Sequence, residues 1–302
     1  MSTSRVLLAA LAFLVACKPV PPDAPEGAEA GTRFLMSSFY ADDLTIGAGL
    51  TGLMNWYDDE GATIDGETPE LDATADFTLT PLAAEDLAPT QTSTTDRPLG
   101  EVPGVMAVST LTGCTFEQVE AFGGRPDQDV VFEGEWAHYA RTYETDRAAY
   151  DAAVADDDFP AIDAALDPTS ADFSETAGAL MLTSNPLGTD EVGVVLDYTL
   201  NLHFRHGRYL IQDEARRAVV ILTWQPEPTE GAGGNNALHQ TWGIDALVEV
   251  DGGVRRFVAT WNDIETALDV EEILVRTQVN RINDFSERLV ELCADPSLLP
   301  DE

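Results

Sequence analysis

The stretch that most constrains the fold is residues 194–205, VVLDYTLNLHFR, in which apolar and polar side chains alternate. The apolar positions are Val194, Leu196, Tyr198, Leu200, Leu202 and Phe204. The polar positions are Asp197, Thr199, Asn201, His203 and Arg205. Because successive side chains of a strand point to opposite faces, this pattern predicts one buried face and one solvated face. Sheets covered on one side only are antiparallel, so we expect an antiparallel sheet.

Further strands are expected after this one. His206-Gly207 is a turn signal, and Asp251-Gly252-Gly253 is typical of a hairpin. Runs of strand length occupy residues 209–213, 218–224, 238–250 and 254–262. The sequence therefore predicts a meander of about five antiparallel strands over about residues 194–262.

Three segments are predicted to be helical. A capping-box pattern at Thr115-Phe-Glu-Gln118 begins a short helix that Gly123-Gly124 ends. Residues 134–155 repeat aromatic side chains near helical spacing, which indicates an amphipathic helix. A long C-terminal helix over about residues 270–293 follows from the apolar side chains Val275, Val279, Ile282, Phe285, Leu289 and Leu292. This helix laid across the apolar face of the meander gives an α+β fold.

The N-terminus has the parts of a secretion signal. Arg5 supplies a positive charge, and Val6 to Val15 form an apolar run too short for a permanent membrane span. The ending Leu14-Val15-Ala16-Cys17 resembles the lipobox of bacterial lipoproteins, a resemblance that covers residues 1–18. It implies a signal peptide at 1–16 that is removed and a Cys17 acylated with diacylglycerol. In that family an aspartate after the cysteine favours the inner membrane, so Lys18 implies an outer-membrane location in the cell envelope.

The rest of the chain divides by composition. Residues 17–31 are rich in proline, alanine and glutamate and indicate a flexible tether. A weakly patterned region over 32–100 ends in the Thr/Ser-rich stretch TQTSTTDRPLG, which has a linker's composition. The patterned α+β domain is expected over 101–296. No family motif marks this body.

Gly47, Gly49 and Gly52 form a GxGxxG pattern, which dinucleotide-binding proteins place between a strand and a helix. The preceding SSFYADD is no buried strand, and Ile46, Leu50 and neighbouring apolar side chains follow helical spacing. We therefore interpret this segment as an amphipathic helix that contains glycines.

The chain of 302 residues carries 54 acidic and 16 basic side chains, a formal net charge of −38. Phosphate backbones are bound by clustered lysines and arginines, so this balance argues against nucleic acid as a partner. The expected partners are a membrane, reached through the lipid anchor, and a protein or apolar ligand of unidentified kind.

Cysteine usage agrees with export. With Cys17 acylated, Cys114 and Cys293 remain as one pair in a compartment that permits disulfides. A Cys114–Cys293 bridge is predicted. The alternative is two separate buried thiols, since free cysteine packs as a small hydrophobe.

The sequence offers little evidence for an enzyme. The sequence contains no GxSxG, HExxH or Cys-x-x-Cys pattern. His203, His206 and His239 are candidate ligands of an open zinc site, with Asp197 or Asp245 as hydrogen-bond acceptors behind them. Strand histidines are more often ordinary polar side chains. Zinc is the only cofactor that the sequence suggests, and it suggests it weakly. The sequence favours a role without catalysis.

Three functions stay open. The first is a lipid-anchored envelope protein that presents an acidic body for interaction or structure. The second is a carrier of a small apolar ligand between sheet and helix, which is similar to the helix-grip carriers in fold only. It predicts a large apolar cavity lined by residues such as Tyr198, Leu200, Trp224 and Phe285. The third is a metal-dependent hydrolase built on the three histidines.

Overall fold

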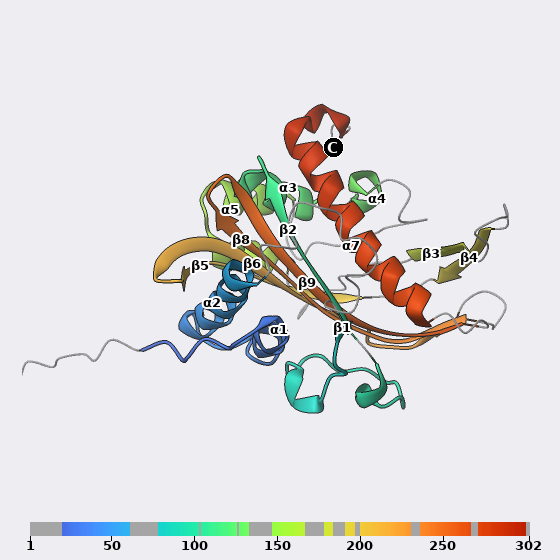
Figure 1. Ribbon diagram of the computed structural model, residues 1–302. Helices are drawn as coiled ribbons and strands as arrows, with labels where there is room; N and C mark the ends of the chain where they lie inside the picture. Colours follow the sequence, from blue (N-terminus) through green and yellow to red (C-terminus); the bar gives the residue numbers. More distant parts are fainter. Residues whose placement is uncertain are drawn as a thin grey trace, which may run out of the picture.

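The fold is α+β, as predicted, with one large antiparallel sheet and helices on both of its faces (Figure 1). A computed structural model describes residues 20–60, 78–102, 104–125, 127–132, 147–166, 178–183, 191–196, 200–230, 236–266 and 271–299. Within these ranges, no helix combines the length and the apolar character needed to span a bilayer.

The large sheet has the strand order β1-β2-β9-β8-β6-β5, and β7 pairs with β8 at one end. Every pairing is antiparallel. The strands are β1 (Thr78–Leu79), β2 (Gly104–Thr112), β5 (Asn201–Ile211), β6 (Glu214–Trp224), β7 (Thr229–Glu230), β8 (Asn236–Val250) and β9 (Gly253–Thr266). The predicted hairpin at Asp251-Gly252 joins β8 to β9, with Gly252 at φ 82°.

The predicted strand over 194–205 is not one strand. Its first residues belong to β4 (Glu191–Leu196), which pairs with β3 (Gly178–Thr183) in a separate two-stranded sheet. Strand β5 begins at Asn201 and continues through the expected turn at His206-Gly207 as far as Ile211. Gly207 lies within this strand, opposite Ala218, and the Tyr209 ring occupies the space that a side chain of residue 207 would fill. The turn falls at Gln212 and Asp213, both at positive φ.

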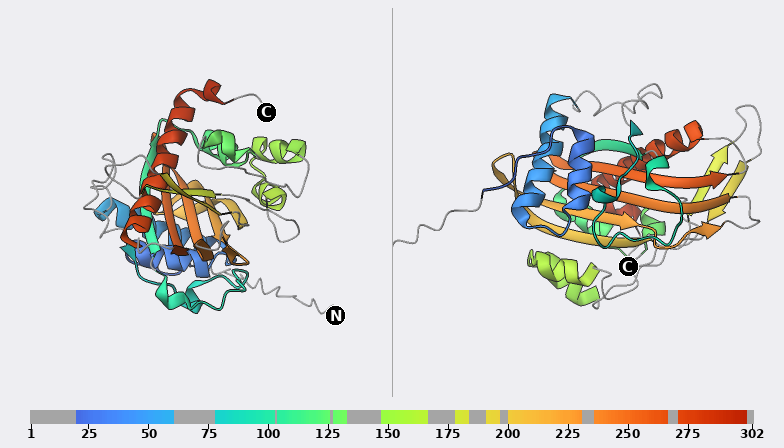
Figure 2. Two further views of the ribbon diagram at one scale, coloured as in Figure 1. Left: turned by 90° about the vertical axis from the view of Figure 1, so that its right-hand side faces the viewer. Right: turned by 90° about the horizontal axis from the view of Figure 1, so that it is seen from below.

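Helices cover both faces of the sheet. We call the side that carries Val220, Ile244 and Phe257 the N-terminal face, since α1 (Ala28–Ser37) and α2 (Asp43–Asp59) pack on it. The side that carries Phe204, Val219 and Leu247 is the C-terminal face, covered by α3 (Phe116–Gly123), α6 (Phe159–Leu166) and α7 (Glu271–Ala294). Figure 2 shows α1 and α2 on one side of the strands and α7 on the other.

The expectation of a solvated face is therefore wrong. His203, predicted to face water, is 4% exposed. Its Nδ1 atom hydrogen-bonds the hydroxyl of Tyr40, and its ring packs 4.7 Å from the ring of Trp224. Arg205 on the same face donates to the carbonyl of Phe39 and to Asp43. The segment between α1 and α2 supplies the partners that the polar side chains need, so this face is buried.

The glycine-containing segment is helical, as interpreted, and forms α2. A Cβ atom on Gly47 would lie 2.6 Å from the carbonyl oxygen of Leu210 in β5. A Cβ atom on Gly49 would lie equally close to the side chain of Leu35 in α1. These glycines let α2 approach both the sheet and α1 closely, which is a packing role.

The remaining helices follow the pattern in part. The C-terminal helix is confirmed as α7. Of the predicted helix over 134–155, α5 (Arg147–Ala155) is present, and residues 134–146 lie outside the described ranges. A short α4 (Gln128–Val131) was not predicted.

The stretch 90–100, interpreted from its composition as a linker, runs along the sheet. Gln91 is buried and donates to the carbonyl of Thr223, and the amide of Thr94 donates to the carbonyl of Pro226. Leu35 and Leu50, which lie earlier in the weakly patterned region 32–100, belong to the same apolar cluster as Phe257 of the sheet.

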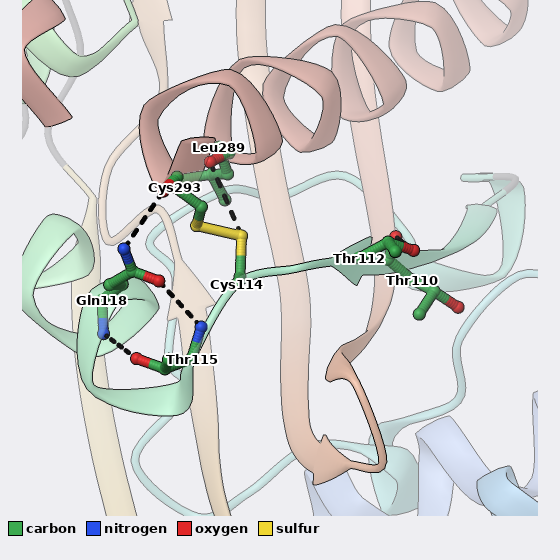
Figure 3. The surroundings of a disulfide bond; sticks show 7 residues. All are labelled: Thr110, Thr112, Cys114, Thr115, Gln118, Leu289 and Cys293. Atoms are coloured by element: carbon green, nitrogen blue, oxygen red, sulfur yellow. Dashed lines mark hydrogen bonds between the residues drawn. A yellow bond between two sulfur atoms is a disulfide. The ribbon is translucent and has the colours of Figure 1, made fainter. Parts of the chain in front are cut away.

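The predicted disulfide between Cys114 and Cys293 is present (Figure 3). Cys114 follows β2, and Cys293 lies in the last turn of α7, 179 residues later. Beside it, Thr115 and Gln118 form the predicted capping box of α3, and Gln118 Nε2 donates to the carbonyl of Cys293. The end of α7 is thus fixed to β2 and to the start of α3.

We predict that the C114S/C293S double variant loses about 3 to 5 kcal/mol of unfolding free energy, because the bridge removes conformational entropy from the unfolded chain. Guanidinium denaturation with and without dithiothreitol measures this loss. Reduction should lower the wild-type midpoint and leave the double variant unchanged. Equal midpoints for oxidised and reduced wild type would contradict the prediction.

Candidate functional site

The three candidate metal ligands do not come together. His203 lies on the N-terminal face, whereas His206 lies on the C-terminal face, opposite Val219 in the strand register. His239 lies near the start of β8, with Nε2 2.9 Å from Glu265 and 2.7 Å from Arg97. Throughout the described ranges, no three histidine, cysteine or acidic side chains are grouped to hold a metal ion. Asp197 lies outside those ranges, and Asp245 pairs with Arg256.

A cavity of about 140 Å³ lies between the C-terminal face of the sheet, α3 and α7. The sheet contributes Leu202, Phe204, Val219, Ile221 and Leu247 to its wall. Helix α3 contributes Phe116, Val119 and Glu120, and α7 contributes Leu289. Most of these side chains are apolar, and the lining also includes the ionisable His206, Asp245 and Arg256.

The strand register builds the floor of this cavity from distant parts of the sequence. One row across the sheet runs from His206 through Val219 and Leu247 to Arg256. The adjacent row on the same face runs from Phe204 through Ile221 to Asp245. The first row has ionisable residues at both ends, and the second row has one, Asp245, at one end.

Helix α3 forms the roof because of its capping box and its spacing. Thr115 and Gln118 fix the first turn at the end of β2. Phe116, Val119 and Glu120 are three or four residues apart, so they share one face of the helix, and all three are buried. The lining also includes Gly123 at the end of α3, which is exposed. The cavity therefore reaches the surface beside this glycine.

An ion pair and a serine connect the cavity floor to α7. Arg256 Nε and Nη2 lie 3.0 and 2.7 Å from Asp245 Oδ2. Arg256 Nη1 also donates to the hydroxyl of Ser286 in α7, and Ser286 accepts from Ser109 in β2. These contacts hold α7 in register over β2 and β9.

Glu120 is the unusual group in the cavity. Its residue is 7% exposed, and its Oε1 atom has no hydrogen-bond partner among the described residues. The nearest cationic candidate is His206, with Nε2 3.5 Å from Oε1. Burial raises the pKa of Glu120 above its ordinary value, and the nearby His206 and Arg217 oppose this change only in part. The site therefore favours a neutral carboxyl group in an apolar wall.

Glu117, one turn earlier on α3, has the opposite environment. Its carboxylate lies 2.6 Å from Arg217 Nη1, and this contact lowers the pKa of Glu117 to about 2. Arg217 also bonds Glu249, whose pKa is lowered for the same reason. These groups line a polar cleft of about 540 Å³ whose Arg208 pairs with Asp157. Because the cleft's arginines pair with its own carboxylates, the apolar cavity is the better candidate site.

Sequence reasoning expected a cavity between sheet and helix but named the wrong lining. Trp224 lies on the N-terminal face, where it packs on His203, and Phe285 stacks on Phe132. Leu200 belongs to the apolar cluster of the C-terminal face without lining the cavity, and Tyr198 lies outside the described residues. Glu120 was missed, although its position four residues after Phe116 places it on the apolar side of α3.

No protein-family model matches this chain, and no curated protein matches it either.

We predict opposite pH dependence at the two carboxyl groups of α3. Above pH 4.5, the ordinary pKa of glutamate, the unfolded chain loses the Glu120 proton while the folded protein keeps it, so stability falls as pH rises. Glu120→Gln removes this loss of stability. The stability of the variant relative to the wild type should therefore increase between pH 4.5 and the raised pKa of Glu120. Glu117 contributes stability above pH 4.5 that is lost as pH falls toward 2.

Thermal unfolding of wild type, E120Q and the matched variant E117Q from pH 3 to 8 measures both effects. The difference between E117Q and wild type should shrink below pH 4.5, whereas the difference between E120Q and wild type should grow above it. Parallel curves for wild type and E120Q above pH 4.5 would show that Glu120 is not protonated in the folded protein.

Proposed function

We propose that this protein is a lipid-anchored protein of the bacterial cell envelope whose acidic body binds a small apolar molecule without transforming it. The observation that carries the binding role is the cavity between the sheet, α3 and α7. An apolar cavity of about 150 Å³ accepts a molecule of the size of benzene, so this one suits a ligand of about that size.

The envelope location rests on separate observations. The lipobox at Leu14-Val15-Ala16-Cys17 supports lipid attachment at Cys17. The buried Cys114–Cys293 disulfide supports an oxidising compartment, because such bonds are kept reduced in most cytosols. The Pro-rich residues 18–31 would hold the body away from the membrane.

The net charge of −38 fits this arrangement. An acidic body is repelled by anionic lipid surfaces, so it stays in solvent and the anchor alone holds it at the membrane. The exposed mouth beside Gly123 would then be open to ligands in the surrounding fluid.

The anchor is tested by intact mass spectrometry of protein extracted with detergent from the producing bacterium. We expect a chain that begins at Cys17 and carries acyl groups. The Cys17→Ala variant should lack the acyl groups and keep its signal peptide, because cleavage follows lipid attachment in this family. An unacylated wild type would overturn the proposed location and leave the cavity's role unaffected.

The cavity is tested with toluene as the probe. At free toluene about tenfold above its Kd, the wild-type melting temperature should rise by about 2–4 °C. Val219→Phe adds a ring to the cavity floor and should abolish this rise. Leu210→Phe introduces the same ring at an exposed site of β5 and serves as the control that keeps the rise. No rise in the wild type, or an equal rise in V219F, would sink the binding role.

A further inference from the structure

We propose that the natural ligand of the cavity is a small primary amine with an apolar body of about the size of a phenyl ring, bound with its ammonium group at Glu120. This inference rests on the proposed binding function and deepens it by naming the ligand class. It is carried by the polar atoms that the cavity leaves without partners.

Two buried carboxylate oxygens in the lining lack hydrogen-bond donors. They are Glu120 Oε1 on α3 and Asp245 Oδ1 on β8, and neither has a partner in the part of the chain that the structure describes. Buried acceptors without donors are rare in folded proteins because they lose their hydration without compensation. When Glu120 is ionised, both orphaned atoms are acceptors, so the missing group is a donor.

The charges around the cavity also favour a cation. The other oxygen of Asp245, Oδ2, accepts hydrogen bonds from two nitrogens of Arg256, so this pair is close to neutral and Oδ1 is left without a donor. An ionised Glu120 would have no cation within hydrogen-bond distance except His206 at 3.5 Å. A monovalent cation would complete this balance, whereas a carboxylate or phosphate ligand would meet two acceptors.

The charges of the groups packed around Glu120 also favour a positively charged ligand. Arg217 lies on the sheet side but is already bonded to Glu117 and Glu249. Glu117 and Asp157 add negative charge near Glu120 and oppose its ionisation in the empty cavity. A bound ammonium group would reverse this opposition and favour the ionised form of Glu120.

The apolar walls require that the rest of the ligand be a hydrocarbon. Val119, Leu202, Phe204 and Leu247 offer no polar atoms in their side chains. An ammonium group offers Glu120 three N–H donors and a positive charge, whereas an alcohol has one neutral donor and a hydrocarbon none. The expected order of affinity is therefore amine, then alcohol, then hydrocarbon of the same shape.

Three probes of one shape test this order by calorimetric titration of the purified full chain at pH 7. They are benzylamine, benzyl alcohol and toluene. We expect benzylamine to bind wild type about tenfold or more tightly than toluene, because charge-assisted hydrogen bonds are the stronger ones. Glu120→Gln should bring the ratio of the two affinities close to one.

The control is Glu101→Gln, which removes an exposed carboxylate just before β2, outside the cavity lining. It should leave benzylamine affinity within about twofold of wild type. An equal loss in E101Q and E120Q would overturn the assignment to Glu120, since it would point to surface charge alone.

The probes separate failure of this inference from failure of the proposed function. Equal binding of benzylamine and toluene, or of benzylamine and benzyl alcohol, would overturn the amine assignment and keep an apolar binding site. Binding of none of the three would overturn both.

Discussion

The central hairpin of β8 and β9 has apolar side chains on both faces, and the rest of the structure follows from that constraint. Ile244 and Val248 point to one side of the sheet, and Leu247 between them points to the other. Full burial of one such side chain is worth about 1.5–3 kcal/mol, so both sides have to be covered. Helices α1 and α2 cover one side, and α3, α6 and α7 cover the other. The N-terminal helices are therefore part of the sheet's core.

The cavity exists because its walls are fixed at several points outside it. The disulfide and the Gln118 bond to Cys293 fix α3 relative to the end of α7. Arg217 holds α3 to β6 and β8 through Glu117 and Glu249, with its guanidinium 5.0 Å from the ring of Phe116. A close-packed interior tends to collapse around small voids, but walls held by covalent and ionic links cannot follow. This frame explains how an apolar space persists between the sheet and two helices.

The sequence was informative where the signal was local. Helix α7, the helical character of Gly47–Gly52, the capping box at Thr115 and the β8–β9 turn all follow from spacing within a few residues. The buried N-terminal face could not be predicted, because Tyr40 meets His203 from a position 163 residues away in the sequence. Only the carrier alternative required a cavity, and the residues that it named do not line this one, for the same reason. Its floor depends on the alignment of His206, Val219, Leu247 and Arg256, which only the register of the strands determines.

Helix α3 places two carboxyl groups in opposite environments within one turn. Glu117 faces Arg217, which favours its charged form, whereas Glu120 faces the apolar cavity, which disfavours it. A glutamine at 120 would keep the shape of the side chain without the cost of a buried acid, so a glutamate there is not explained by packing. Perturbed acids in shaped cavities are typical of binding and catalytic sites, where a less stable empty state is offset when the ligand arrives. The contrast between Glu117 and Glu120 therefore separates a side chain that stabilises the fold from one whose burial costs stability while the cavity is empty.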